Sequence, residues 1–140
     1  MGRNRRGYPL TSLGRVTVVP LPPTPKITEI SADMGQTYVQ FAEGWKTDRC
    51  IMDIAEDPET LYATSIYIYV KGNNLTEEYI QTLVCSVPLP DGSKPVTIDA
   101  VTFVDGGFEM HIEIGVPYFP GEDFQITIAG ITSGIMTMDN

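Results

Sequence analysis

The 140-residue sequence predicts one all-β domain, a β-sandwich with one short helix and an extended N-terminal arm. Three observations lead to this prediction. Residues 26–140 contain short runs rich in β-branched and aromatic residues, several runs alternate apolar and polar positions, and glycine or proline separates them. By contrast, residues 1–25 are basic and rich in proline. We therefore divide the chain into an arm, residues 1–25, and a sandwich domain, residues 26–140, which is long enough to bury a core of its own.

In chain order, the expected strands share high β propensity and are bounded by turn-forming residues. They are RVTVV (15–19), KITEIS (26–31), TYVQFA (37–42), RCIMDI (49–54), TSIYIYV (64–70), TLVCSV (82–87), VTIDAVTFV (96–104), FEMHIEIG (108–115) and FQITIAG (124–130). The C-terminal GITSGIMTMDN (130–140) is expected to close the sheet of its own domain, or alternatively to add an edge strand to a neighbour.

Two local patterns are sharper than the rest. Asp105-Gly106-Gly107 supplies the positive φ angles of a tight hairpin, and on its return strand Glu109, His111 and Glu113 alternate with apolar residues. That alternation predicts one buried and one solvated face. In NNLTEEYIQTL (73–83), Asn74 with Glu77 three residues later has the spacing of a capping box, which predicts a short helix.

Three stretches resemble bacterial immunoglobulin-like modules called IPT or TIG domains. PKITEISADMG (25–35) is similar to their opening, IYIYVKGNNL (66–75) to their second signature, and VPYFPGEDFQITIAG (116–130) to their closing strand. The resemblance implies an immunoglobulin-like β-sandwich that serves as a binding or structural module. It implies no catalytic residues.

Charge is divided unevenly along the chain. Residues 1–15 carry four arginines and no acid, whereas residues 16–140 carry five basic and 18 acidic side chains, a net charge of −13. So acidic a domain is expected to repel nucleic acid and anionic membranes, because phosphate binding depends on Lys and Arg. No run of 18 apolar residues and no apolar signal segment is present, so we expect synthesis in a cytoplasm and no membrane partner.

The arm combines cations, apolar anchors and a stiff spacer. The proline run VVPLPPTPK (18–26) favours an extended polyproline conformation, in which 25 residues span roughly 75 Å. A segment of this composition becomes ordered mainly by binding. The arm is therefore either a disordered tail or, if it is ordered, a segment that lies across another subunit. We predict the second, with Arg3, Arg5, Arg6, Tyr8, Leu10, Leu13 and Arg15 as its partner-binding residues.

Candidate sites in the domain are few, and we expect no cofactor, metal or catalytic residue. His111 has no second histidine or cysteine cluster, and we interpret it as a solvated strand residue. The acidic run from Asp53 to Glu59 is either a solvated loop or a cation site. Cys50 and Cys85 lie in apolar surroundings and are expected to be buried thiols. Trp45 either fills the core, the commoner role, or stacks on a sugar.

In build, the basic arm on an acidic β domain resembles small accessory proteins of tailed-phage virions, which staple their neighbours through extended termini. That resemblance implies a non-enzymatic structural protein of the virion, a capsid decoration (cement) or connector-associated protein. Its expected partners are other virion proteins or copies of itself, and it would be oligomeric on a lattice. The alternative is a carbohydrate-binding or adhesive immunoglobulin-like module that uses Trp45 and exposed tyrosines.

Overall fold

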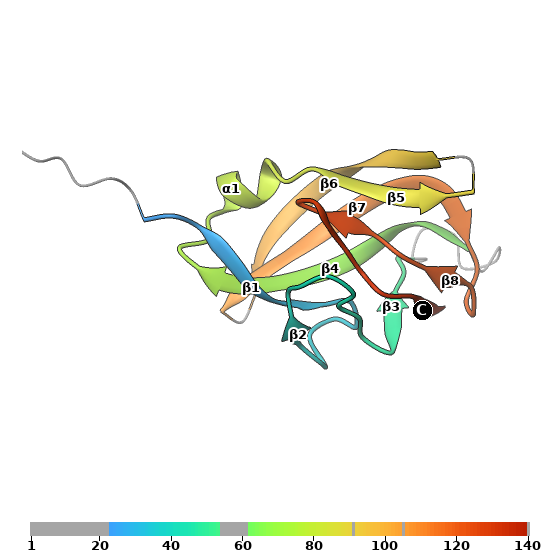
Figure 1. Ribbon diagram of the computed structural model, residues 1–140, viewed down its shortest axis with the longest axis horizontal. Coiled ribbons are helices and arrows are strands. Elements are labelled where there is room, and N and C mark those ends of the chain that lie inside the picture. The colour runs from blue at the N-terminus through green and yellow to red at the C-terminus, as the bar shows by residue number, and fades with distance from the viewer. Residues whose placement is uncertain (1–22, 54–61, 91, 105, 140) are drawn as a thin grey trace, which may run out of the picture.

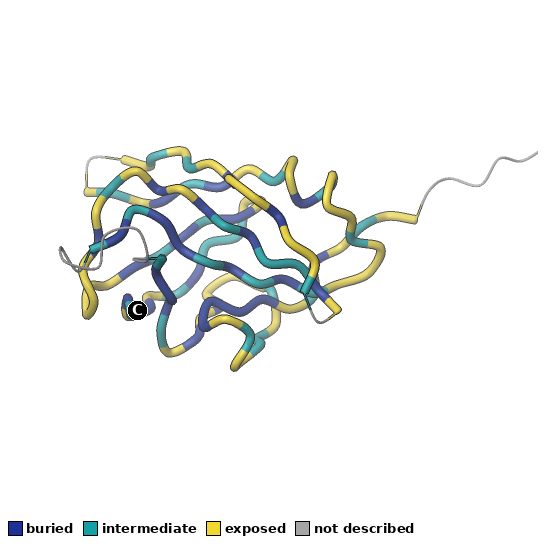
Figure 2. Tube along the Cα trace, turned by 180° about the vertical axis from the view of Figure 1, so that it is seen from behind, coloured by how far each residue is buried: buried dark blue, intermediate teal, exposed yellow. Residues whose placement is uncertain are grey.

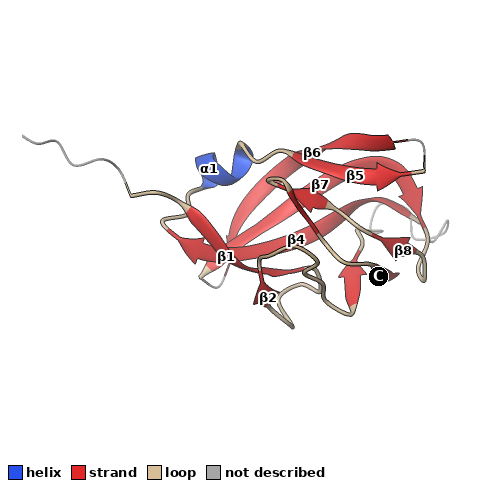
Figure 3. Ribbon diagram, viewed as in Figure 1, coloured by secondary structure: helices blue, strands red, loops and turns tan. Residues whose placement is uncertain are grey.

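A computed structural model describes residues 23–53, 62–90, 92–104 and 106–139 (Figure 1). Strands dominate, and α1 is the helix formed by the described residues (Figure 3). In order, the elements are β1 (Lys26–Ser31), β2 (Val39–Gln40), β3 (Arg49–Ile51), β4 (Ala63–Asn73), α1 (Glu77–Gln81), β5 (Cys85–Leu89), β6 (Gly92–Val104), β7 (Gly107–Tyr118), β8 (Asp123–Phe124), β9 (Thr127–Ile128), β10 (Ile131–Thr132) and β11 (Met136–Asp139). The prediction of an all-β fold with one short helix is confirmed.

The larger sheet has eight strands in the order β10-β9-β5-β6-β7-β4-β1-β2, and every neighbouring pair is antiparallel. Its centre is formed by the long strands β4, β6 and β7, which curl along the length of the molecule (Figure 1). The predicted hairpin joins β6 to β7, with Val104 paired to Gly107 and Gly106 at a φ of 82°. By contrast, the outermost strands β10 and β2 have two residues each.

The smaller sheet has the order β3-β11-β8. In it, β11 runs parallel to β3 and antiparallel to β8, so the C-terminal strand lies between two segments of its own chain. The closing role predicted for the C-terminal segment is therefore confirmed. Buried side chains from both sheets form one hydrophobic core, to which the small sheet contributes Cys50, Phe124, Met136 and Met138.

Alternation along β4 and β7 decides which face of the large sheet joins this core. Met110, Ile112 and Ile114 are buried, while Glu109, His111 and Glu113 point to the opposite face. In Figure 2, buried positions alternate with exposed or half-buried ones along the sheet. The buried face predicted for the return strand is confirmed at Met110, Ile112 and Ile114. On the opposite face Glu113 is exposed, whereas Glu109 and His111 are half-buried.

The predicted cap of the helix is wrong by two residues. The N-cap of α1 is Thr76, whose hydroxyl oxygen accepts a hydrogen bond from the backbone N–H of Tyr79 at 3.1 Å. Asn74 lies before the helix at a φ of 58°, a region that asparagine tolerates well, and its side chain donates to the Thr24 carbonyl. No helix formed by the described residues has the length and hydropathy to cross a membrane.

The pairing of the long strands of the large sheet is interrupted at two places, both close to His111. The β6–β7 register shifts between Ile98 and Ala100, which leaves Asp99 as the extra residue of a bulge. The β4–β7 register shifts between Ala63 and Ser65. Because bulges redirect side chains, they can bring groups together that regular pairing would keep apart.

The predicted strand at 124–130 forms two short strands instead of one. Phe124, Ile126 and Ile128 are all buried, as the alternation predicts, but β8 pairs with β11 in the small sheet and β9 pairs with β5 in the large one. The segment therefore passes from one sheet to the other. Among the other predicted strands, 26–31 coincides with β1, and 15–19 lies outside the described residues.

Candidate functional site

Polar and aromatic side chains gather on the face of the large sheet that points away from the core. Three cross-strand rows on β4, β7 and β6 form this surface, which we call the outer face. The rows are Tyr69–Glu109–Thr102, Tyr67–His111–Ala100 and Ser65–Glu113–Thr97.

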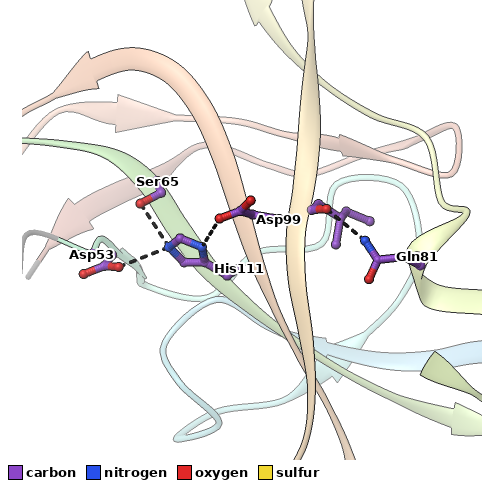
Figure 4. A network of polar contacts seen from close by, with 6 residues as sticks. Asp53, Ser65, Gln81, Asp99 and His111 are labelled. Atoms are coloured by element: carbon purple, nitrogen blue, oxygen red, sulfur yellow. Dashed lines mark hydrogen bonds and ion pairs between the residues drawn. The ribbon is translucent and has the colours of Figure 1, made fainter. Parts of the chain in front are cut away.

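His111 lies at the centre of the outer face and is contacted at both ring nitrogens (Figure 4). Its Nε2 is 3.1 Å from Asp53 Oδ2 and 3.1 Å from Ser65 Oγ, and its Nδ1 is 3.3 Å from Asp99 Oδ2. The Tyr67 ring packs beside the imidazole, with 5.3 Å between ring centroids. The His111 side chain is 21% exposed, so it is half-buried rather than fully solvated as the sequence predicted.

Local backbone structure explains how these groups meet. Asp99 is the bulged residue of β6, and Ser65 follows the register shift in the β4–β7 pairing. After β3, Met52 forms a bridge with Ile66, and the Asp53 N–H donates to the Ser65 carbonyl at 3.0 Å. The chain beyond β3 thus runs beside β4 and presents Asp53 to the histidine. The cluster links β3, β4, β6 and β7.

The order Ser65–His111–Asp99 resembles the nucleophile, base and orienting acid of hydrolases. Asp53, however, shares Nε2 with the serine. Because a carboxylate is a stronger acceptor than a hydroxyl, an Nε2 proton donated to Asp53 leaves that nitrogen no lone pair to take the serine proton. Ser65 is also only 8% exposed. The arrangement is therefore better suited to joining strands than to activating a nucleophile.

The row next to His111 contains a second short polar contact. The Tyr69 hydroxyl donates to Glu109 Oε2 at 2.8 Å. Burial, followed by the hydrogen bond and negative charge of Glu109, raises the pKa of the Tyr69 hydroxyl to about 12.

This shift predicts a specific alkaline sensitivity. A tyrosine in the unfolded chain ionises near pH 10, so the stability contributed by the raised pKa of Tyr69 is present in full below about pH 10 and is lost as the pH rises through about 12. We expect the free energy of unfolding to fall less for Tyr69→Phe than for the unchanged protein between about pH 9 and about pH 11.5. Urea unfolding at stepped pH measures both curves. Parallel curves would contradict this role of Tyr69.

Both cysteines are buried free thiols, as predicted. Burial raises the pKa of Cys50 far above its usual range and raises the pKa of Cys85 to about 11. Because the thiolate is the reactive form, neither side chain is suited to nucleophilic or redox chemistry at neutral pH.

Trp45 fills the core, the commoner of its two predicted roles. It is 4% exposed and belongs to the hydrophobic cluster, so its ring offers no face on which a sugar could stack. The carbohydrate-binding alternative therefore loses its principal residue. Its indole Nε1 has no hydrogen-bond partner among the described residues.

The predicted partner-binding residues of the arm lie outside the described residues. They are Arg3, Arg5, Arg6, Tyr8, Leu10, Leu13 and Arg15. Of the acidic run, Asp53 is described and contacts His111, while Glu56, Asp57 and Glu59 are outside. Within the described ranges, no group of three or more His, Cys, Asp or Glu side chains is placed to hold a metal ion.

Comparison with known proteins found no matching family model, no matching curated protein and no matching solved structure. Immunoglobulin sandwiches divide their strands more evenly, as four and three, than the eight and three of this chain. Membership in the IPT or TIG family therefore stays a prediction.

Proposed function

We propose that this protein is a non-enzymatic structural component of a phage virion, a capsid decoration or connector-associated protein that joins neighbouring subunits through its arm. The observation that carries the proposal is the division of charge, four arginines in residues 1–15 against a net charge of −13 in residues 16–140. A cationic segment and an acidic domain attract each other, and each copy of the chain supplies both.

The proline run of the arm supports this role. Prolines at 20, 22, 23 and 25 directly precede β1 in the sequence, and such a run favours a stiff polyproline spacer between the arginines and the domain. β1 begins at Lys26, near α1 at one end of the large sheet (Figure 1). If each copy binds its arm to a neighbour, it also receives the arm of another copy. The subunits are then joined without any additional folded domain.

The assignment to a virion rests on likeness of build. A small all-β domain with an extended terminus that staples its neighbours is the arrangement of phage accessory proteins. Capsid and connector proteins are thus further candidate partners beside copies of the same chain.

The test is the mass of the protein in solution at low and high salt. We expect oligomers of the full-length chain at low salt, where attraction between the arginines and the acidic domain is weakly screened. At about 0.1–0.15 M salt the screening length falls to about 8–10 Å, and exposed charges attract each other less. Raising the salt should dissociate them. A chain that begins at residue 23 keeps the Asn74–Thr24 hydrogen bond and should remain a monomer in both buffers. Multi-angle light scattering after gel filtration measures these masses.

Two controls accompany this measurement. Far-ultraviolet circular dichroism and the emission of the buried Trp45 report whether the shortened chain is folded. Full-length protein with Arg3, Arg5 and Arg6 replaced by serine tests the charge without shortening the chain. Oligomers that persist without the arm, or monomers of the full-length chain at all salt concentrations, would refute stapling between copies.

A further inference from the structure

We propose that the outer face of the large sheet is the surface that receives the arginines of the arm from a second copy of this chain. The inference rests on the proposed function, and it identifies the surface of the domain to which the arm binds. The receiving groups are the carboxylates of Asp99, Glu109 and Glu113, with the rings of Tyr67 and Tyr69 beside them.

The charge of this face favours a cationic occupant. Glu113 is exposed, Glu109 is half-buried, and the Asp99 side chain is 60% exposed. Two lysines lie at its margins. Lys71 Nζ sits over the Tyr38 ring at 4.3 Å, and Lys94 Nζ is 3.3 Å from the position that a Cβ on Gly115 would take. The carboxylates between these lysines form an acidic strip along β7.

The side chains of the strip match the chemistry of arginine. A guanidinium group pairs with carboxylates through parallel hydrogen bonds and also stacks on aromatic rings. Tyr69 is hydrogen-bonded to Glu109, and Tyr67 lies between that row and the row of Glu113. Lysine can also lie over an aromatic ring, as Lys71 does over Tyr38, but it cannot form paired hydrogen bonds with a carboxylate, so the strip favours arginine.

Spacing gives a second match. The carboxylates belong to three successive rows, Glu109 in the first, Asp99 on His111 in the second and Glu113 in the third. Rows two residues apart along a strand are separated by about 7 Å. Alternate residues of an extended arm, such as Arg3 and Arg5, have the same separation of about 7 Å. An extended arm lying along β7 would therefore place Arg3 and Arg5 at successive rows of the strip.

Several other described acids are already engaged. Asp139 pairs with Arg49 at 2.8 Å, Glu43 accepts from the Thr132 N–H at 3.1 Å, and Asp33 is buried and accepts from Ser31. Glu77 and Glu78 lie in the first turn of α1, where negative charge stabilises the helix. Within the strip, Glu109 accepts from Tyr69 and Asp99 contacts His111, but both of these partners belong to the same face, and Glu113 is exposed beside them. The strip therefore presents three carboxylates on one face to an incoming cation.

The experiment is a charge exchange in the full-length protein, read as the apparent dissociation constant of the oligomer by analytical ultracentrifugation at low salt. Glu109→Lys/Glu113→Lys should weaken assembly by at least about tenfold, and Arg3→Glu/Arg5→Glu should do the same. Combining all four substitutions restores opposite charges and should return the constant to within about threefold of the original.

A matched control places the same charge change elsewhere. Asp48→Lys/Glu122→Lys alters two exposed acids away from the outer face and should leave assembly within about threefold of the unchanged protein. Glu109→Gln/Glu113→Gln, which keeps side-chain size, serves if the lysine pair fails to fold.

The outcomes separate the two proposals. If the arm variant loses assembly while both outer-face variants assemble normally, the arm clamps at another surface and this inference is overturned, with the proposed function intact. Failure of the fourfold variant to regain assembly also overturns it. A full-length chain that is monomeric at every salt concentration overturns the stapling function itself.

Discussion

Replacing Phe124 with alanine is expected to lower the free energy of unfolding by about 4 kcal/mol. Phe124 is 2% exposed, and its ring meets the Tyr118 ring edge-on, with 5.3 Å between the centroids. The substitution removes a buried ring and leaves a cavity between β8 and the end of β7, and it also removes an aromatic pair worth about 0.5–1.5 kcal/mol. Urea unfolding followed by the emission of Trp45, the single tryptophan, measures the loss.

Phe103 provides a matched control for this substitution. It also pairs with another aromatic ring, that of Phe108 at 5.5 Å, but it is 69% exposed near the β6–β7 turn. Phe103→Ala should therefore lower the free energy of unfolding by no more than the roughly 0.5–1.5 kcal/mol of its aromatic pair, because it removes little buried surface. Similar losses for the two variants would show that Phe124 is not part of the core.

The second large effect is expected at Gly72, which pairs with Ile27 where β4 meets β1. A Cβ at this position would overlap the Lys26 carbonyl oxygen and lie 2.8 Å from Ile27 Cα. Both are backbone atoms, so no side-chain rotation relieves the overlap. We expect Gly72→Ala to force β1 away from β4 and to cost about 3 kcal/mol, measured by urea unfolding of the full-length chain.

Gly121→Ala is the appropriate comparison. Gly121 has a φ of 95°, but no atom lies within 4 Å of its Cβ position, so only backbone strain of about 1 kcal/mol is expected. Equal losses at the two positions would mean that small shifts of the backbone relieve the contact with β1, so that this contact does not require glycine at Gly72.

Features that depend on neighbours in the sequence were predictable. The strand at 26–31, the hairpin that joins β6 to β7 and the buried alternation of Met110, Ile112 and Ile114 all follow from local pattern. The helix cap was missed because Asn74 and Thr76 are both good capping residues, and the choice depends on backbone angles. The broken strand at 124–130 was missed because alternation shows which residues are buried but not which sheet buries them.

The cluster around His111 was beyond local pattern for a similar reason. Its partners Asp99, Ser65 and Asp53 lie 12, 46 and 58 residues away, and the first two lie at shifts in strand register. The sequence placed His111 on the polar face correctly. It carried no signal that carboxylates would occupy both ring nitrogens, because that depends on the path of the chain after β3.

The two-residue strands at the borders of the large sheet limit how copies of the protein can associate. A sheet grows by adding strands to long exposed edges, and β10 and β2 offer too few backbone groups for this. Open-ended stacking of copies into fibres is thus disfavoured by the fold itself. Association through the proposed arm would instead need one receiving face for each added subunit, and it would stop when those faces are occupied.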